Sequence, residues 1–198
     1  IAQLVPAADV SGYADFKGSV HGDLSDPVLQ AEFSAIDGKL FQQPYKSLRG
    51  SAGGSLHGVK IDSFSMENGD HETWIAKGTV GFTGARQLDL QIDTVGARME
   101  DVAALVAPDQ PITGNIDNTI RITGTMDQPY AIGYIHFYSG SYRGLVLSGM
   151  DGDYTLQNGI LNVHDFHIFS PMVDMDLNGT ITQDKELGLK VAAHDIQL

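Results

Sequence analysis

Residues 20–27 of this chain, VHGDLSDP, return after 102 positions as residues 122–129, ITGTMDQP. The same offset joins Gly38 to Gly140, and it slips by one residue later in the chain. A repeat at a fixed period indicates stacked structural units that share one continuous core. The repeat therefore predicts a long, repetitive structure rather than a self-contained enzyme.

The spacing of the repeat divides the 198 residues into two β repeat units, residues 1–101 and residues 102–198. We expect both units to be part of one continuous structure, because no linker separates them. The chain opens on Ile1 with the repeat already under way. We therefore expect it to be an excised piece of a longer protein.

The composition excludes several classes of protein. The formal net charge is −13 and the basic residues are scattered, which argues against nucleic acid as a partner because phosphate contacts need clustered Lys and Arg. The absence of cysteine removes disulfides, thiolate metal sites and Cys nucleophiles. No apolar run approaches the ~18 residues of a membrane-spanning helix. A hydrophobic fraction of 42% is enough for a packed core, so we expect a folded acidic chain.

Apolar and polar residues alternate along most of the chain, which is typical of strands with one apolar face. Residues 173–181 (VDMDLNGTI) and 88–92 (LDLQI) show the pattern clearly, and turns that contain Gly or Pro separate the runs. The runs predict an all-β fold. The candidate lining of the shared apolar face is Leu29, Phe33, Trp74, Val80, Phe82, Leu88, Leu90, Ile92, Ile116, Ile120, Ile122, Val173, Met175, Leu177, Ile181, Leu187, Leu189 and Val191.

One short helix is predicted between the two repeat units. Residues 98–106 (RMEDVAALV) place three apolar side chains roughly on one side of a helix. Pro108 and Pro111 follow and would end it.

Strands with one apolar face must cover that face with something. A second sheet would make a sandwich, and a chain that coils on itself would make a β-helix. A third solution is an open trough that leaves its apolar strip uncovered, and a strip larger than a few hundred Å² needs a ligand or partner. Periodicity alone leaves these three architectures open.

Residues 22–27 (GDLSDP) and 124–129 (GTMDQP) share the pattern Gly-x-[Leu/Met]-x-x-Pro. They stand among alternating apolar positions, and later strand ends such as 74–80 (WIAKGTV) and 175–181 (MDLNGTI) belong to the same pattern. The pattern resembles the repeats of TamB and the wider AsmA-like envelope proteins, over essentially the whole chain. The resemblance implies a repetitive β-taco, or half-pipe, with a hydrophobic inner groove.

The resemblance also implies a setting and partners. The setting is the periplasm of a diderm bacterium, in a full-length protein anchored in the inner membrane. The implied roles are phospholipid transfer between the inner and outer membranes and support of outer-membrane protein assembly. The implied partners are phospholipid acyl chains, neighbouring repeats of the same full-length chain and an Omp85-type outer-membrane barrel. A dimer of the isolated piece is a further partner to consider.

Two motifs that look like metal sites are better explained by strands. Residues 174–181 (DMDLNGTI) copy the first eight positions of an EF-hand loop, but Lys185 stands where the bidentate Glu belongs. His164 and His167 are three residues apart, which predicts opposite faces of a strand, so a shared metal would need a bulge. We therefore predict no metal site and no cofactor.

No motif indicates catalysis, and we predict that the chain is not an enzyme. There is no Gly-x-Ser-x-Gly elbow, and no phosphate-binding glycine loop with its Lys. Residues 134–138 (YIHFY) place two tyrosines and a histidine on one face, with Ile135 and Phe137 on the other. This run predicts a strand packed on both sides or one at the edge of the groove.

The leading hypothesis is a fragment of a periplasmic bridge that carries phospholipids between membranes through a hydrophobic groove. The alternative is a structural β-solenoid with a closed core, or a chaperone-like scaffold that assists outer-membrane protein assembly without lipid transport. A scaffold of the second kind would present strand edges as templates for client strands.

Overall fold

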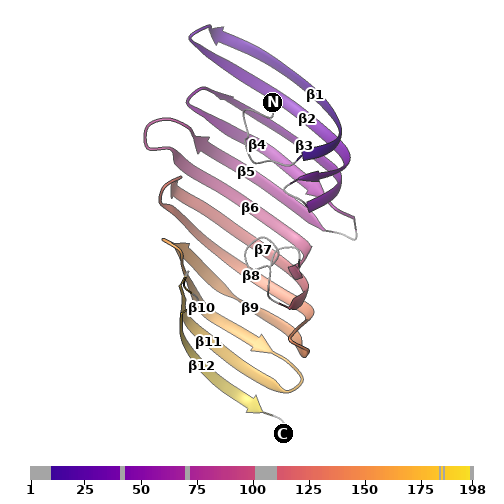
Figure 1. The fold of residues 1–198 in the computed structure, drawn as a ribbon, viewed down its shortest axis with the longest axis vertical. Helices are drawn as coiled ribbons and strands as arrows, with labels where there is room; N and C mark the ends of the chain where they lie inside the picture. Colours follow the sequence, from indigo (N-terminus) through magenta and orange to yellow (C-terminus); the bar gives the residue numbers. More distant parts are fainter. Residues whose placement is uncertain are drawn as a thin grey trace.

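The computed structural model describes residues 10–40, 43–69, 72–100, 111–182, 184 and 186–196. These residues form twelve β-strands in one sheet, and each strand pairs antiparallel with the next strand in the sequence. Figure 1 shows the strands following one another along the long axis of the molecule, with β1 at one end and β12 at the other. The predicted all-β fold is confirmed.

The strands fall into two sets of six. The first set is β1 (Val10–Asp23), β2 (Asp26–Leu40), β3 (Gln43–Ser55), β4 (Gly58–Glu67), β5 (Thr73–Gly81) and β6 (Gln87–Arg98). The second set is β7 (Ile112–Thr125), β8 (Pro129–Tyr142), β9 (Leu145–Gln157), β10 (Ile160–Phe169), β11 (Val173–Ile181) and β12 (Leu187–Ile196).

Local turn chemistry explains why the chain reverses so often. Between β8 and β9, Arg143 and Gly144 have φ of 50° and 83°, and between β9 and β10 Asn158 and Gly159 have φ of 52° and 74°. Two successive residues with positive φ are the requirement of a type I′ hairpin turn, whose twist matches that of paired strands. At the β1–β2 turn, Asp23 Oδ1 instead accepts hydrogen bonds from Ser25 N and Oγ at 2.8 and 2.7 Å.

The repeat seen in the sequence extends to irregularities of the backbone. A register shift at residues 11–13 of β1 recurs at residues 113–115 of β7. A bulge between Ile61 and Phe64 of β4 recurs between Val163 and Phe166 of β10. β-Bulges re-aim side chains and bend strands, so the two sets of six strands share the same local geometry. The division at residues 101 and 102 itself stays a prediction, because β6 pairs with β7 as any other two neighbours do.

A single antiparallel sheet excludes two of the three architectures that the sequence left open, and the open trough with its groove stays a prediction. In the described part of the chain there is no second sheet and no parallel coil, so neither a sandwich nor a β-helix is formed there. Arg98, where the predicted helix was to begin, is the last residue of β6, and Met99 and Glu100 directly after it are helical. Most of the predicted helix, residues 101–106, lies outside the described residues.

Most of the buried apolar residues form two clusters. The first contains Ala35, Tyr45, Leu48 and Met66 from β2, β3 and β4, and the second contains Ala97, Ile116 and Phe137 from β6, β7 and β8. Trp74 of β5 packs against both clusters and therefore links them.

Candidate binding surface: the apolar face

The register of the sheet shows which side chains share a face. Residues paired across antiparallel strands point the same way, and the next residue along each strand points the opposite way. Following the pairs from β1 to β12 gives a line that we call the Ile122 row: Gly18, Ala31, Ala52, Ile61, Gly78, Leu90, Ile122, Ala131, Leu156, Leu161, Ile181 and Leu187. All twelve members are apolar or glycine.

A parallel line, which we call the Ile120 row, lies two residues away on each strand, or three on β4 because of its bulge. Its members are Phe16, Phe33, Gly50, Phe64, Ala76, Ile92, Ile120, Gly133, Tyr154, Val163, Gly179 and Leu189. Again no member is charged. We call the side of the sheet that carries these rows the apolar face and the opposite side the polar face.

Sixteen of the eighteen residues predicted to line the groove lie on this one face. Eight are in the two rows above: Phe33, Leu90, Ile92, Ile120, Ile122, Ile181, Leu187 and Leu189. Eight more lie in flanking rows of the same face: Leu29, Trp74, Val80, Leu88, Ile116, Met175, Leu177 and Val191. The structure thus brings these side chains together, while their role as a groove lining stays a prediction.

The other two predicted residues are not assigned to this face. Phe82 follows the end of β5, where its N–H donates to the carbonyl of His57 at 2.8 Å, and its side chain is 49% exposed. Val173 is the first residue of β11 and pairs with Ile196 at the end of β12, and its side chain lies outside the described part of the structure.

Several apolar-face residues were missed from the sequence. The bulges of β4 and β10 insert extra residues, so Phe64 and Phe166 fall out of step with the apolar residues before them. In β3 the run Gly50 to Gly54 has no visible alternation, although Gly50 and Ala52 lie on the apolar face. A search of the sequence pattern that allowed one inserted residue per strand could have found Phe64 and Phe166.

The apolar face is packed at its middle and open at its ends. In the middle, Phe137 is 0% exposed and Ile116 is 3% exposed. At the ends, Phe16 and Val20 of β1 are 60% and 67% exposed, and Leu187 of β12 is 66% exposed. Large apolar side chains therefore meet solvent at both ends of the sheet, which is where an apolar ligand or partner would contact the protein.

Polar atoms interrupt the apolar face at one place near its centre. The buried Thr94 pairs across β6 and β7 with Asn118, whose Oδ1 accepts a hydrogen bond from Tyr154 Oη at 2.9 Å. Burial raises the pKa of Tyr154, so its phenol remains a donor. Nearby, Glu72 is 5% exposed and accepts from Trp74 Nε1 at 2.8 Å. Glu72 also accepts a hydrogen bond from Asn68 Nδ2 at 2.9 Å, whereas the buried Thr94 Oγ1 has no hydrogen-bond partner among the described residues.

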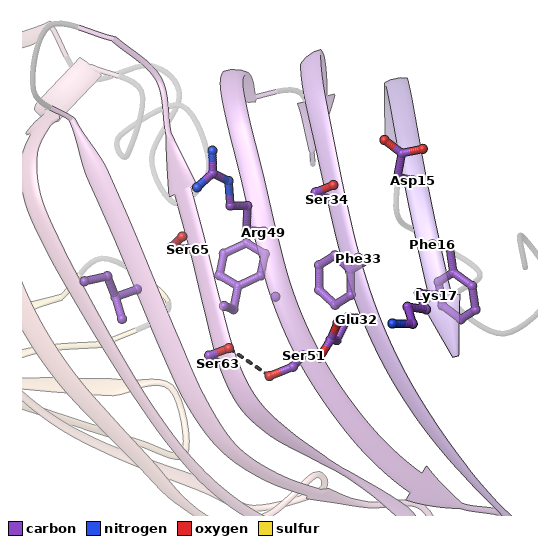
Figure 2. Close-up of a pocket in the computed structure, with 13 residues that line it drawn as sticks. Asp15, Phe16, Lys17, Glu32, Phe33, Ser34, Arg49, Ser51, Ser63 and Ser65 are labelled. Carbon is purple, nitrogen blue, oxygen red and sulfur yellow. Dashed lines mark hydrogen bonds between the residues drawn. The ribbon is translucent and has the colours of Figure 1, made fainter. Parts of the chain in front are cut away.

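Three hollows in the described part of the chain lie on the opposite, polar face. A depression of about 640 Å³ lies over β1 to β4 and reaches Ile75 of β5. Figure 2 shows the residues that line it. Each of the strands β1 to β4 contributes three consecutive residues, two from the polar face and one between them from the Ile120 row. The next apolar-face residues, such as Ala35 and Leu48, take no part, so the depression opens on the polar face. Its Ser51 and Ser63 hydroxyls are 2.9 Å apart and hydrogen bonded.

A row of alternating Asp and His crosses the polar face of β7 to β11. Its members, in cross-strand order, are Asp117, His136, Asp151, His167 and Asp176. His167 Nδ1 lies 2.9 Å from Asp176 Oδ1, and His194 Nε2 lies 2.7 Å from Asp176 Oδ2. The bond to Asp176 raises the pKa of His167, and the two histidines lower the pKa of Asp176.

This row corrects one sequence prediction. His164 and His167 were predicted on opposite faces, but a bulge at Asp165, with φ of 49°, turns both to the polar face opposite Asp153 and Asp151. Even so, no three Asp, Glu or His side chains among the described residues are arranged to hold a metal ion. Residues 174–181, the EF-hand look-alike, lie in β11, as the strand interpretation predicted.

Comparisons with known proteins add no relative. No family model, no curated protein and no solved structure matches this chain. In the described part of the chain, no helix has the length and apolar character needed to cross a membrane.

Proposed function

We propose that the apolar face binds lipid acyl chains and that the chain is a segment of a periplasmic bridge that conducts phospholipids between membranes. The observation that carries the proposal is the continuity of the apolar face. The Ile122 row crosses all twelve strands without one polar side chain, and no second layer of described residues covers it. In this proposal the sheet curls into a half-pipe whose inner wall is this face.

The chemistry of the face suits mobile acyl chains better than one tightly held ligand. Burial of each methylene group is worth about 0.8 kcal/mol wherever along the track it occurs. Ala, Gly, Leu and Ile follow one another along the row, so adjacent positions offer similar contacts. A chain that gains as much at one strand as at the next can slide with small barriers and needs no catalytic residue.

The charge of the polar face also favours lipid binding on the apolar face. It carries acidic rows such as Asp117, Asp151 and Asp176, and the net charge of the chain is −13. These carboxylates repel anionic headgroups and keep that side hydrated. The lipid tails therefore have one face to occupy.

Binding is tested with purified protein by native mass spectrometry, by lipid extraction of the same sample and by uptake of a fluorescent fatty acid. We expect co-purified phospholipid and saturable uptake. Ile122→Asp places a charge on the apolar face and should reduce uptake at least tenfold. Thr119→Asp, on the same strand but on the polar face, is the matched control and should leave uptake unchanged.

A charge at Ile122 could unfold the sheet, so a second variant keeps the test decisive. Val20 is 67% exposed on the apolar face of β1, and Val20→Asp should fold normally by circular dichroism while lowering uptake. Lipid-free protein with no uptake, or equal uptake by all variants, contradicts the proposal.

The alternative is a scaffold that assists outer-membrane protein assembly without moving lipid. The unpaired edges of β1 and β12, in the described part of the sheet, favour it because an open edge can template a client strand. Folded, lipid-free protein that still retards aggregation of an unfolded outer-membrane barrel would support the scaffold over the conduit.

A further inference from the structure

We infer that the depression over β1 to β4 is a second binding site, centred on Arg49, which takes the phosphate group of a small phosphorylated sugar or polyol. The site lies on the polar face, on the other side of the sheet from the proposed lipid track. The inference therefore does not depend on lipid binding. Three neighbouring side chains, Ser34, Arg49 and Ser65, form the centre of the site.

The register of the sheet places these three side chains next to one another. Ser34 of β2 pairs with Arg49 of β3, which pairs in turn with Ser65 of β4. Directly paired residues on one face of an antiparallel sheet have their Cβ atoms about 4.5–5.5 Å apart. Figure 2 shows Arg49 between the two serines. Each of these three strands has a paired neighbour on both sides, so the arrangement does not depend on an edge of the sheet.

The hydrogen-bonding capacity of these three side chains is unused. Neither the guanidinium of Arg49 nor the hydroxyls of Ser34 and Ser65 have a hydrogen bond or ion pair with another described residue. By contrast, the guanidinium of Arg121 on the same face lies 3.2 Å from the carboxylate of Asp89. Arg49 is exposed, so its N–H donors are open to a ligand in the depression, with a hydroxyl on either side.

The second half of the chain shows what the first half lacks. At an offset of 102, the equivalents of the three residues are His136, Asp151 and His167. There the central Asp151 is an acceptor, with His136 Nδ1 3.1 Å from its Oδ1 and His167 paired with it across the sheet. In the first half the central residue is the donor Arg49, and no acceptor stands beside it. A bound anion would supply that acceptor.

The charge of the depression suits an anion, although the chain as a whole is acidic. Among the lining residues, Lys17 and Arg49 balance Asp15 and Glu32. The equivalents of these four residues in the second half are two aspartates, a threonine and a tyrosine, without a cation. The depression therefore has no net charge, whereas the corresponding surface of the second half repels anions.

The donors and the size of the depression define the class of ligand. An arginine fork binds two oxygens of one phosphate, and a phosphate keeps a further oxygen for a hydroxyl, which a carboxylate lacks. The depression measures about 640 Å³, and a second hollow of about 400 Å³ shares Lys17, Glu32 and Ser51 with it. Volumes of this size are typical of sites for small organic molecules. Ser19 and Gln30 of the second hollow add polar groups for the hydroxyls of a sugar or polyol.

Binding is tested by isothermal titration calorimetry of the purified chain with glycerol phosphate, with inorganic phosphate and glycerol as reference compounds. We expect saturable binding of glycerol phosphate, weaker binding of inorganic phosphate and none of glycerol. Arg49→Gln should weaken binding at least tenfold, and Arg49→Lys, which keeps the charge but loses the fork, at least threefold. Ser65→Ala should weaken it about fivefold.

Lys190→Gln is the matched control. It removes one positive charge from an exposed position on the polar face of β12, so it changes the net charge as Arg49→Gln does and should leave the affinity unchanged. Equal losses in these two variants would show attraction by net charge alone and would overturn the inference. So would the absence of saturable binding, or inorganic phosphate bound as tightly as glycerol phosphate.

Vesicles that contain phosphatidic acid carry the same phosphate monoester on a lipid and identify the source of the phosphate. Binding of glycerol phosphate without binding of the vesicles would support a site for a soluble phosphate ester. Binding of both, each weakened by Arg49→Gln, would support a site that also takes a lipid headgroup. Vesicle binding that Arg49→Gln leaves unchanged, with no binding of glycerol phosphate, would overturn the inference.

Discussion

In each six-strand half an aromatic ring packs against a pair of glycines, but the ring comes from a different strand in the two halves. In β1–β6, Tyr45 of β3 is 3% exposed and lies where a Cβ on Gly12 or Gly38 would touch its hydroxyl. In β7–β12, the equivalent glycines, Gly114 and Gly140, face the ring of Phe137 of β8 instead. The equivalent of Phe137 in the first half is the small residue Ala35. A different strand therefore supplies the ring in each half, although the ring packs against equivalent glycines.

The comparison teaches which parts of the repeat are constrained. The paired glycines, the bulges and the apolar rows recur, because they shape the sheet and its packed face. The polar faces have diverged. The row that reads Asp15, Ser34, Arg49, Ser65 and Ile75 in the first half reads Asp117, His136, Asp151, His167 and Asp176 in the second. A solvated face tolerates such change at little cost in stability.

The largest expected effect is at the exchanged ring. Phe137→Ala removes a fully buried ring and should lower the free energy of unfolding by about 3–5 kcal/mol in urea titrations. Leu147 is the equivalent of Tyr45 and packs against the buried cluster that contains Phe137. The double variant Phe137→Ala, Leu147→Tyr rebuilds the arrangement of the first half and should recover about 0.5–3 kcal/mol, the usual coupling between contacting residues. A double variant no more stable than Phe137→Ala would show that the two halves do not share one packing solution.

The next effect is at the glycine beneath the ring. A Cβ at Gly140 would overlap the Thr113 carbonyl oxygen and the Phe137 ring, so Gly140→Ala should cost about 1–3 kcal/mol. Gly53→Ala is the control, because there the nearest atom, 3.2 Å away, is Cγ of the flexible Gln30 side chain. Equal unfolding midpoints for the two variants in urea would contradict the account of paired glycines.

The all-β architecture could be predicted largely from the sequence, whereas the packing of the side chains could not. Alternation and the 102-residue repeat predicted the all-β fold, and they placed Ile122 and Leu177 on one face. The exchange of Tyr45 for Phe137 could not be predicted, because each ring fills space created by glycines on neighbouring strands. Nor could the bulge that turns His164 and His167 to one face, since one inserted residue leaves no clear mark in a pattern of period two.

A smaller difference between the two halves is expected in how the polar face makes stability depend on pH. The pKa of His167 is raised above the usual 6.5 by its bond to Asp176 and by the carboxylates of Asp174 and Asp151, which also face it. A raised histidine pKa contributes stability that is fully present below pH 6.5 and is lost as pH rises through the folded-state value. The pKa of Asp176 is lowered below 3.8, so its contribution is present above that pH and is lost on stronger acidification.

The Asp and His row should stabilise the second half most at pH values between the folded-state pKa of Asp176 and that of His167. We expect urea midpoints of the wild-type chain to fall between pH 6 and pH 8 more steeply than those of His167→Gln. Ser65→Gln, at the equivalent position of the first half, is the control and should keep the wild-type slope. Identical pH dependence of wild type and His167→Gln would exclude a contribution from this row.

The most direct test of the conduit is to ask which face of the sheet touches lipid. A photo-reactive benzophenone side chain is placed singly at Ile61, Ile122 or Ile181 of the apolar face, and at the adjacent polar-face residues Lys60, Arg121 or Thr180. Each folded variant is irradiated with labelled phospholipid. The account predicts cross-links at all three apolar-face positions and few at their neighbours. Cross-links that are absent, or equal on the two faces, would contradict it.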